Sequence, residues 1–227
     1  MWKIVSHNEA FLVIDNVLCP DDFTNFLVDV EALRYNYPQG EWNRIWQLTD
    51  PQALSSGSFY LSQNPIGHGM DKIALEFRKA IEMSNFYGSH NDKWADVGFR
   101  VYKQSRGSKL ISHSDSPQYV GAGVYYCHSE WRSSWGGELF FPDISATEED
   151  VYNKTNISID QKLQTLATGR YVSPKPNRMV LINSGVLHST NRIDPDAGNN
   201  IRTSVSAFLL RRDQATSSSS EKITIGD

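Results

Sequence analysis

The sequence predicts a mostly β fold: a double-stranded β-helix, or jelly roll, with supporting helices near its N-terminus. Two segments in the first ninety residues carry apolar side chains at helical spacing. From Val97 onward the pattern changes to the two-residue period of strands, and clusters of Gly, Pro, Ser and Asn divide this region into short lengths. Eight short strands behind two helices are typical of two packed sheets with helices covering one of them.

The first ninety residues contain the expected supporting elements. Phe11–Val17 is an apolar run that predicts a short buried strand. A helix is expected to open with Cys19–Asp22, where proline and acids suit a first turn, and to continue to Leu33. Tyr35–Pro65 is expected to be a long loop region, and a second helix is expected over Met70–Asn85.

The rest of the chain predicts eight strands separated by turn-forming clusters. The expected strands are Val97–Lys103, Lys109–Asp115, Gln118–His128, Glu138–Phe141, Arg170–Ser173, Arg178–Asn183, Leu187–Ile193 and Ile201–Arg211.

The length of 227 residues fits one domain over residues 1–212, with helical support at 18–90 and the jelly roll at 97–212. Thr147–Thr168 is expected to be an insertion, and 213–227 a polar, disordered tail.

The composition excludes several classes of protein. The formal net charge is −4 with no basic stripe, which argues against nucleic acid as a partner. No apolar run approaches about 18 residues, and the N-terminus has no apolar signal segment, so a soluble protein without a membrane partner is expected. Cys19 and Cys127 have no Cys-x-x-Cys spacing, which favours reduced thiols and a cytoplasmic location. The oligomeric state is left open.

The pattern His-x-acid occurs four times, so its context must select among the copies. The four triplets are His7-Asn8-Glu9, His90-Asn91-Asp92, His113-Ser114-Asp115 and His128-Ser129-Glu130. Only His113 falls on a predicted strand together with its acid, and residues two apart on a strand project from the same face. The side chains of His113 and Asp115 can therefore converge on one ion, and the other three triplets are interpreted as chance pairs on polar turns.

His188 is a candidate for a third ligand. It follows the apolar strand that ends at Asn183 and a turn at Gly185. A lone histidine in such a place is more often a core or edge residue than a ligand. Two imidazoles and one carboxylate can, however, occupy one face of an octahedral Fe(II) and leave positions for a co-substrate and O2.

The last strand indicates what lies beside these candidate ligands. One of its faces carries Arg202, Ser204, Ser206 and Phe208, and the other is apolar. A row of Arg and Ser on a strand between two sheets predicts a polar cavity inside the roll, where a guanidinium can hold a carboxylate with two parallel hydrogen bonds. A solvent-facing strand with an ion-paired arginine is the alternative.

Several short motifs along the chain, each weak by itself, together form a pattern that is specific for one protein family. The set comprises Phe99-Arg100-Val101-Tyr102, His113–Pro117, Gly123–Tyr126, Trp135–Pro142, Asn177–Ile182, His188 and Arg202. These motifs resemble the Fe(II)/2-oxoglutarate-dependent oxygenases, and within them the prolyl-4-hydroxylase-like branch, which includes the hypoxia-sensing prolyl hydroxylases. The similarity covers Val97 to Leu210, and the N-terminal helices fit the support helices of that fold.

That resemblance implies roles for seven residues. The residues implied to bind Fe(II) are His113, Asp115 and His188. The residues implied to contact the 2-oxoglutarate co-substrate are Arg202, Tyr126, Tyr102 and Ser204. Arg202 and Tyr126 would hold the distal carboxylate, and no catalytic residue beyond the metal ligands is implied. Since Tyr125 and Tyr126 point to opposite faces of a strand, one of them must serve ordinary packing.

The implied reaction is a hydroxylation. The chain would be an Fe(II)- and 2-oxoglutarate-dependent dioxygenase that uses O2 to hydroxylate an unactivated C–H, with release of succinate and CO2. A prolyl residue of a protein or peptide is the leading substrate, and ascorbate is an additional implied factor. Three alternatives stay open: a hydroxylase of a free amino acid or other small metabolite, a cupin-like metal enzyme that uses no oxoacid, and a jelly-roll binding module without turnover.

Four aromatic or basic features are candidates for a substrate mouth. They are Trp131, Arg132, Trp135 and the Trp42–Trp46 loop. Aromatic residues in loops also pack as local staples, which is the alternative interpretation.

The spacing between His188 and Arg202 is a few residues longer than that family usually shows. The surplus residues, Asp194–Asn200, are interpreted as a longer hairpin tip. Arg192 lies nearer to His188, but it is expected on the same strand as that histidine, which favours Arg202.

Overall fold

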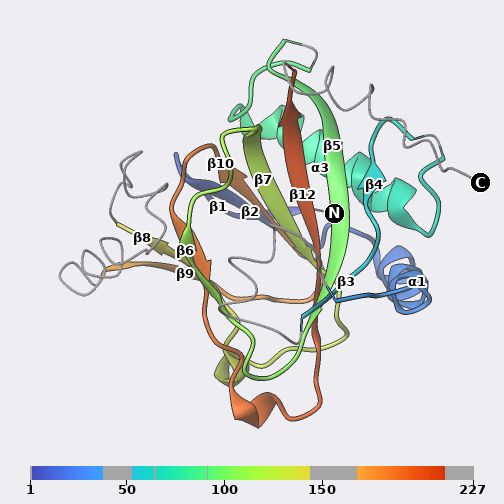
Figure 1. The fold of residues 1–227 in the computed structure, drawn as a ribbon, viewed down its shortest axis with the longest axis vertical. Helices are drawn as coiled ribbons and strands as arrows, with labels where there is room; N and C mark the ends of the chain where they lie inside the picture. The colour runs from blue at the N-terminus through green and yellow to red at the C-terminus, as the bar shows by residue number, and fades with distance from the viewer. Residues whose placement is uncertain (1, 38–52, 64, 91, 144–167, 213–227) are drawn as a thin grey trace, which may run out of the picture.

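Two antiparallel sheets form the centre of the computed structural model, which describes residues 2–37, 53–63, 65–90, 92–143 and 168–212 (Figure 1). The large sheet has the order β1-β2-β10-β7-β12-β5-β3, with β4 also paired to β5. The small sheet has the order β6-β11-β8-β9. The Trp42–Trp46 loop, the tail at 213–227 and all but the last residue of the Thr147–Thr168 segment lie outside the described residues.

The eight predicted strands are all present. Along the chain they pass from one sheet to the other, except that β8 and β9 follow each other and pair within the small sheet. Their bounds are β5 (Trp94–Gln104), β6 (Leu110–His113), β7 (Tyr119–Tyr126), β8 (Leu139–Pro142), β9 (Gly169–Val172), β10 (Arg178–Asn183), β11 (His188–Thr190) and β12 (Arg202–Arg211). The predicted fold class, mostly β with supporting N-terminal helices, is confirmed. The division into a single domain over 1–212 stays a prediction.

The elements before β5 include both predicted helices and three strands that were not predicted. The elements before β5 are β1 (Lys3–His7), β2 (Phe11–Asp15), α1 (Pro20–Glu31), β3 (Leu54–Ser55), β4 (Phe59–Tyr60) and α3 (Met70–Ser84). The unpredicted strands are β1, β3 and β4. β1 is an edge strand with mostly exposed side chains, so its sequence lacks the alternation that marks a half-buried strand. β3 and β4, at two residues each, are too short to carry a period.

The helices α1 and α3 cover the outer face of the large sheet, and the small sheet faces its other side (Figure 1). Two glycines of β7 allow this close packing. A Cβ at Gly123 would meet the Phe77 ring of α3 at 2.8 Å, and one at Gly121 would meet the Tyr87 ring at 2.0 Å. No helix in the described part of the chain is long and apolar enough to cross a membrane.

The space between the two sheets is filled at one end and open at the other. Near β2 and β10 the inner faces form an apolar cluster in which Phe11 stacks on Phe141, with ring centroids 4.4 Å apart. Toward β5 and β12 the inner faces carry polar side chains that line a cavity. The fold therefore places a cavity between the sheets.

Asp15, at the end of β2, is buried beneath two basic side chains. Arg178 Nε donates to Asp15 Oδ1 at 2.6 Å, and Lys175 Nζ donates to Oδ2 at 2.7 Å. Arg178 and Asp15 are also register partners of β10 and β2. Burial by itself raises the pKa of the Asp15 carboxyl, but the hydrogen bonds and charges of Arg178 and Lys175 outweigh it and lower that pKa below its usual value.

We expect Asp15→Asn to reduce the free energy of unfolding by about 2–3 kcal/mol near neutral pH, because it leaves Arg178 without its carboxylate partner. The folded-state pKa lies below the unfolded value of about 3.9, so the carboxylate stabilises the fold fully above the unfolded pKa. That contribution disappears as the pH falls through the folded-state pKa.

Urea unfolding of wild type and variant from about pH 7 down to about pH 3 measures this difference. Glu130→Gln, which neutralises an exposed carboxylate, is the matched control and should change little at any pH. If the difference in unfolding free energy between wild type and Asp15→Asn is as large at about pH 3 as at about pH 7, the assigned ion pairs are contradicted.

Candidate metal centre

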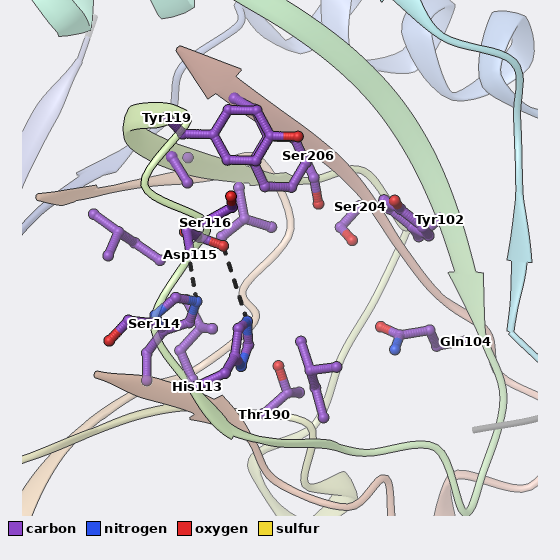
Figure 2. A pocket seen from close by; sticks show the side chains of 18 of the residues that line it. Tyr102, Gln104, His113, Ser114, Asp115, Ser116, Tyr119, Thr190, Ser204 and Ser206 are labelled. Carbon is purple, nitrogen blue, oxygen red and sulfur yellow. Dashed lines mark ion pairs between the residues drawn. The ribbon is translucent and has the colours of Figure 1, made fainter. Parts of the chain in front are cut away.

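Three candidate ligands meet where β6 pairs with β11. His113 and His188 are register partners in this antiparallel pair, and their ring centroids lie 4.5 Å apart. Asp115 Oδ1 lies 3.9 Å from His113 Nε2, and Asp115 Oδ2 lies 4.0 Å from His188 Nε2 (Figure 2). Among the described residues, this is the one group of three or more His, Cys, Asp or Glu whose ligand atoms all lie within 4.8 Å of one another.

Asp115 reaches the centre in a different way from the one the sequence predicted. The strand was expected to continue to Asp115, but β6 ends at His113. Ser114, the residue between them, donates its hydroxyl to Gly185 O at 3.2 Å and so fastens this segment to the turn before β11. The carboxylate therefore comes from a segment just beyond the strand and not from strand alternation.

Backbone carbonyls fix the orientation of both imidazoles in the same way. His113 Nδ1 lies 2.8 Å from Ile111 O, and His188 Nδ1 lies 3.0 Å from Val186 O. A carbonyl oxygen can only accept, so the proton of each neutral ring sits on Nδ1. Each Nε2 then has its lone pair directed at Asp115, which is the arrangement that a metal ligand needs.

The charge state of His113 also suits ligation. Burial, and next the neighbouring His188, lower the pKa of His113 to about 4, against the opposing influence of Asp115 and the Ile111 carbonyl. This imidazole is therefore neutral near neutral pH and can donate a lone pair to a cation.

The donor set fits an octahedral ion such as Fe(II). Ligand atoms at about 2.1 Å from an ion lie about 3 Å apart when they are adjacent in an octahedron. The observed separations of 3.9 and 4.0 Å would need to close by about 1 Å, which is within reach of side-chain rotation. Two imidazoles and a carboxylate on one side would leave the side facing the cavity open.

The remaining His-x-acid triplets do not gather ligands among the described residues. His7 and His90 are exposed. His128 is buried, and its two ring nitrogens lie 3.1 Å from Thr203 O and 2.8 Å from Pro174 O. Both of its nitrogens therefore face backbone carbonyls, and its ring lies beside the Tyr126 and Trp131 rings.

A cavity of about 510 Å³ extends from the three candidate metal ligands between the two sheets. It is lined by all three of those ligands and by all four residues assigned to the co-substrate, Arg202, Tyr126, Tyr102 and Ser204. Ser206 and Phe208 line it as well, so the polar face predicted for the last strand does face a cavity. Figure 2 shows Tyr102, Ser204 and Ser206 across this cavity from His113 and Asp115.

Arg202 lies deep in this cavity, with a relative exposure of 5%. Its Nη1 donates to Gly137 O at 2.5 Å, and its Nη2 donates to the side-chain oxygen of Gln104. Tyr126 Oη and Gln104 Nε2 are buried close to it and have no hydrogen-bond partner among the described residues. A guanidinium beside two buried donors is a site for a carboxylate.

Tyr125 and Tyr126 divide as the strand geometry requires. Tyr126 lines the cavity, and burial raises its pKa to about 12, so its hydroxyl keeps its proton as a donor. Tyr125 faces the helices, where its ring packs against Phe26 and its hydroxyl bonds to Asn177 Oδ1 at 2.9 Å. Tyr125 is therefore the residue that serves packing.

Sequence reasoning missed Gln104 and the contribution of the Gly136-Gly137 loop. Gln104 is the register partner of Arg202 on β5 and follows Tyr102 on the same strand face, so the two-residue period could have found it. Gly136 has a φ of 69°, and a Cβ there would lie 2.2 Å from Arg192 O. This glycine therefore allows the backbone to pass close enough for Gly137 O to meet Arg202.

The three described residues proposed for a substrate mouth do not line the cavity. Trp135 is buried with Ile193 and Ala197, and Trp131 packs on it with ring centroids 5.4 Å apart. Arg132 lies over the Trp135 ring at 5.3 Å. Their geometry favours the alternative interpretation, a local aromatic staple.

The segment before Arg202 is not a hairpin tip, which corrects that prediction. β11 belongs to the small sheet and β12 to the large one, so residues 191–201 cross between sheets. Asp194–Asn200 includes a short 3-10 helix, whose Ala197 is buried beside Trp135. Arg192 bonds to Gly107 O at 2.8 Å, outside the cavity.

The fold is similar to those of several solved oxygenases. A Trichoplax adhaerens prolyl hydroxylase in complex with a hypoxia inducible factor peptide fragment has a TM-score of 0.63 at 16% identity, over 93% of this chain and 88% of that chain. A Pseudomonas putida prolyl-4-hydroxylase has a TM-score of 0.57 at 16% identity, over 89% and 93%. HygX from Streptomyces hygroscopicus, with nickel and 2-oxoglutarate bound, has a TM-score of 0.56 at 14% identity, over 88% and 83%.

These similarities confirm, for the fold, the resemblance to the Fe(II)/2-oxoglutarate-dependent oxygenases. Within that class, the fold resembles the prolyl-4-hydroxylase-like branch. No protein-family model matches this sequence. No curated protein matches it either.

We expect Mn(II), a redox-stable substitute for Fe(II), to raise the Tm. At about a 100-fold excess of free ion over its Kd, the stabilisation is about 2.7 kcal/mol. Asp115→Ala and His188→Ala should abolish the increase, while His90→Ala, which removes an exposed histidine elsewhere, should keep it. Thermal unfolding with and without the ion measures the effect. An equal increase in wild type and Asp115→Ala would place the ion at another site.

Proposed function

We propose that this chain is an Fe(II)- and 2-oxoglutarate-dependent dioxygenase. The observation that carries the proposal is a single cavity that has a His–Asp–His group on one side and a buried arginine with two further donors at its deep end. A cation site and a carboxylate site in one cavity suit a co-substrate that carries a keto acid at one end and a carboxylate at the other.

In this proposal, each residue of the cavity has a defined task. His113, Asp115 and His188 hold Fe(II), with the imidazoles kept in the ligating tautomer by Ile111 O and Val186 O. Bound Fe(II) supplies the chemistry that couples O2 and 2-oxoglutarate to hydroxylation, with release of succinate and CO2.

The deep end of the cavity orients the co-substrate. Arg202, held by Gln104 and Gly137, binds its distal carboxylate, and Tyr126 Oη donates a further hydrogen bond. Tyr102 and Ser204 are cross-strand partners that line the cavity between this carboxylate and the open end. The sheets on both sides exclude bulk water from the reacting atoms.

A prolyl residue of a protein or peptide is the proposed substrate. The support is the fold similarity to prolyl hydroxylases, of which the Trichoplax enzyme was solved with a peptide fragment. A small molecule is the second candidate, since HygX was solved with hygromycin B. The proposal includes ascorbate as an accessory reductant and a cytoplasmic location, the latter suggested by the isolated Cys19 and Cys127.

Anaerobic addition of Fe(II) and 2-oxoglutarate should give a weak visible charge-transfer band that is lost in His113→Ala. Arg202→Leu should raise the KM for 2-oxoglutarate by about 100-fold, and Tyr126→Phe by about 10-fold, since charge-assisted and buried hydrogen bonds are lost. Tyr125→Phe, at the next position but on the outer face, is the matched control and should leave this KM unchanged.

Two outcomes would favour the other functions. Wild-type O2-dependent turnover by Arg202→Leu without added oxoacid would indicate a cupin-like metal enzyme. Folded, metal-loaded protein that gives neither the band nor succinate would indicate a binding module.

A further inference from the structure

A second arginine lies at the other end of the cavity-facing rows of β5 and β12. On the β5–β12 ladder, Arg202 is opposite Gln104, and Arg100 is opposite Ser206. Arg100 is four residues from Gln104 on β5 and projects from the same face, because side chains two apart alternate back to one side. The cross-strand pair that contains Arg100 is therefore about 13 Å along the strand from the pair that contains Arg202.

The two ends of this row differ in burial. Arg202, at one end, is almost fully buried in the cavity. Arg100 is only half-buried, and its Nη2 donates to the exposed Ser58 hydroxyl at 2.7 Å. The end that carries Arg100 is therefore open to solvent and to an incoming molecule.

Polar aromatic side chains surround this open end. Tyr119 lines the cavity and packs against Phe208 with ring centroids 4.9 Å apart. Figure 2 shows the Tyr119 ring beside Ser206 and above Asp115, away from Gln104. Burial raises the pKa of Tyr119 to about 12, and a hydrogen bond from the Gln118 side chain opposes this increase. The charges of Asp115, which raises it, and Arg100, which lowers it, contribute less. Tyr119 thus lies within electrostatic range of both Arg100 and the metal centre.

The Tyr102 hydroxyl, which lines the cavity between its two ends, also interacts with Arg100. Burial raises the pKa of Tyr102, and the charge and hydrogen bond of the Arg100 guanidinium oppose that increase. The group as a whole is one guanidinium with two phenolic hydroxyls that keep their protons as donors. Such a set binds an anion, and a planar guanidinium in particular matches a carboxylate.

The charges of the cavity-lining residues favour an anionic substrate group over a cationic one at the open end. The acidic residue among the described lining residues is Asp115, whose charge the proposed metal ion would compensate. Arg100 itself is not among the residues that line the cavity, so a substrate carboxylate bound to it would lie just outside, and the rest of the substrate would enter past Tyr119 and Phe208, which do line the cavity.

We propose that Arg100 is a specificity-determining residue that binds a carboxylate of the substrate at the open end of the cavity. This inference rests on the proposed oxygenase function and narrows its substrate class. The carboxylate has two sources: the α-carboxylate of a free imino or amino acid, or an acidic residue next to the target residue of a peptide.

Matched pairs of compounds test this inference in a succinate-release assay. L-proline and L-prolinamide test the free-acid source. A blocked Ala-Ala-Pro-Ala-Ala peptide and its versions with Asp before or after Pro test the peptide source. In at least one pair, we expect the carboxylate member to have a KM about 10- to 100-fold lower, with a smaller change in kcat.

Variants then assign that preference to one side chain. Arg100→Gln should remove the KM advantage, and Arg100→Glu should instead favour a peptide with Lys in place of Asp. Arg106→Gln, which removes an exposed arginine of the following turn, should keep the preference of the wild type. Circular dichroism melting checks that each variant is folded.

The failures of the two proposals are distinguishable. If the protein forms succinate from 2-oxoglutarate without substrate, but no carboxylate member has a lower KM than its partner or stimulates release, the Arg100 inference is overturned and the oxygenase stands. The same holds if Arg100→Gln keeps the preference. If folded, iron-loaded protein forms no succinate under any condition, the proposed function itself fails.

Discussion

The antiparallel pairing of β6 with β11 is the constraint on which the candidate metal centre depends. It sets His113 directly opposite His188, and a one-residue slip would turn one imidazole to the other face of the sheet. Each ring is also held by the carbonyl two residues before it, so its ligating nitrogen is oriented before an ion binds. Because little ordering is left for the binding step, more of the metal–ligand interaction appears as affinity.

The large sheet adds a second constraint, since the two faces of β12 serve different purposes. Its outer face is apolar and packs in the same core as α1 and α3, while its inner face lines the cavity. Burying the Arg202 guanidinium costs solvation free energy, and the hydrogen bonds to Gly137 O and Gln104 offset part of it. The buried donors of Tyr126 and Gln104 that have no partner among the described residues are those that a bound carboxylate would satisfy.

Local periodicity explains what the sequence could predict and what it could not. Both helices, the eight strands and the polar face of β12 have signals within ten or so neighbouring residues, and all were found. Gln104 was missed because its role appears only through its register with Arg202. The crossing at residues 191–201 was taken for a hairpin, because no local pattern tells a tight turn from a passage between sheets. Trp131 and Trp135 could equally have faced a substrate or each other, and tertiary packing decided.

In the proposed function, the deep end of the cavity binds the co-substrate and the open end binds the substrate. Similarity of fold therefore says more about the first than about the second. A fold supports many chemistries, so similarity at 16% identity or less to a prolyl hydroxylase solved with a peptide fragment and to HygX solved with hygromycin B does not define the substrate. A co-substrate with a fixed structure needs the same kind of deep-end donors whatever is hydroxylated. The open end has no such requirement and can change with each substrate. Under the proposed function, the residues that would select the substrate are therefore those near the open end, Arg100, Tyr119 and Phe208.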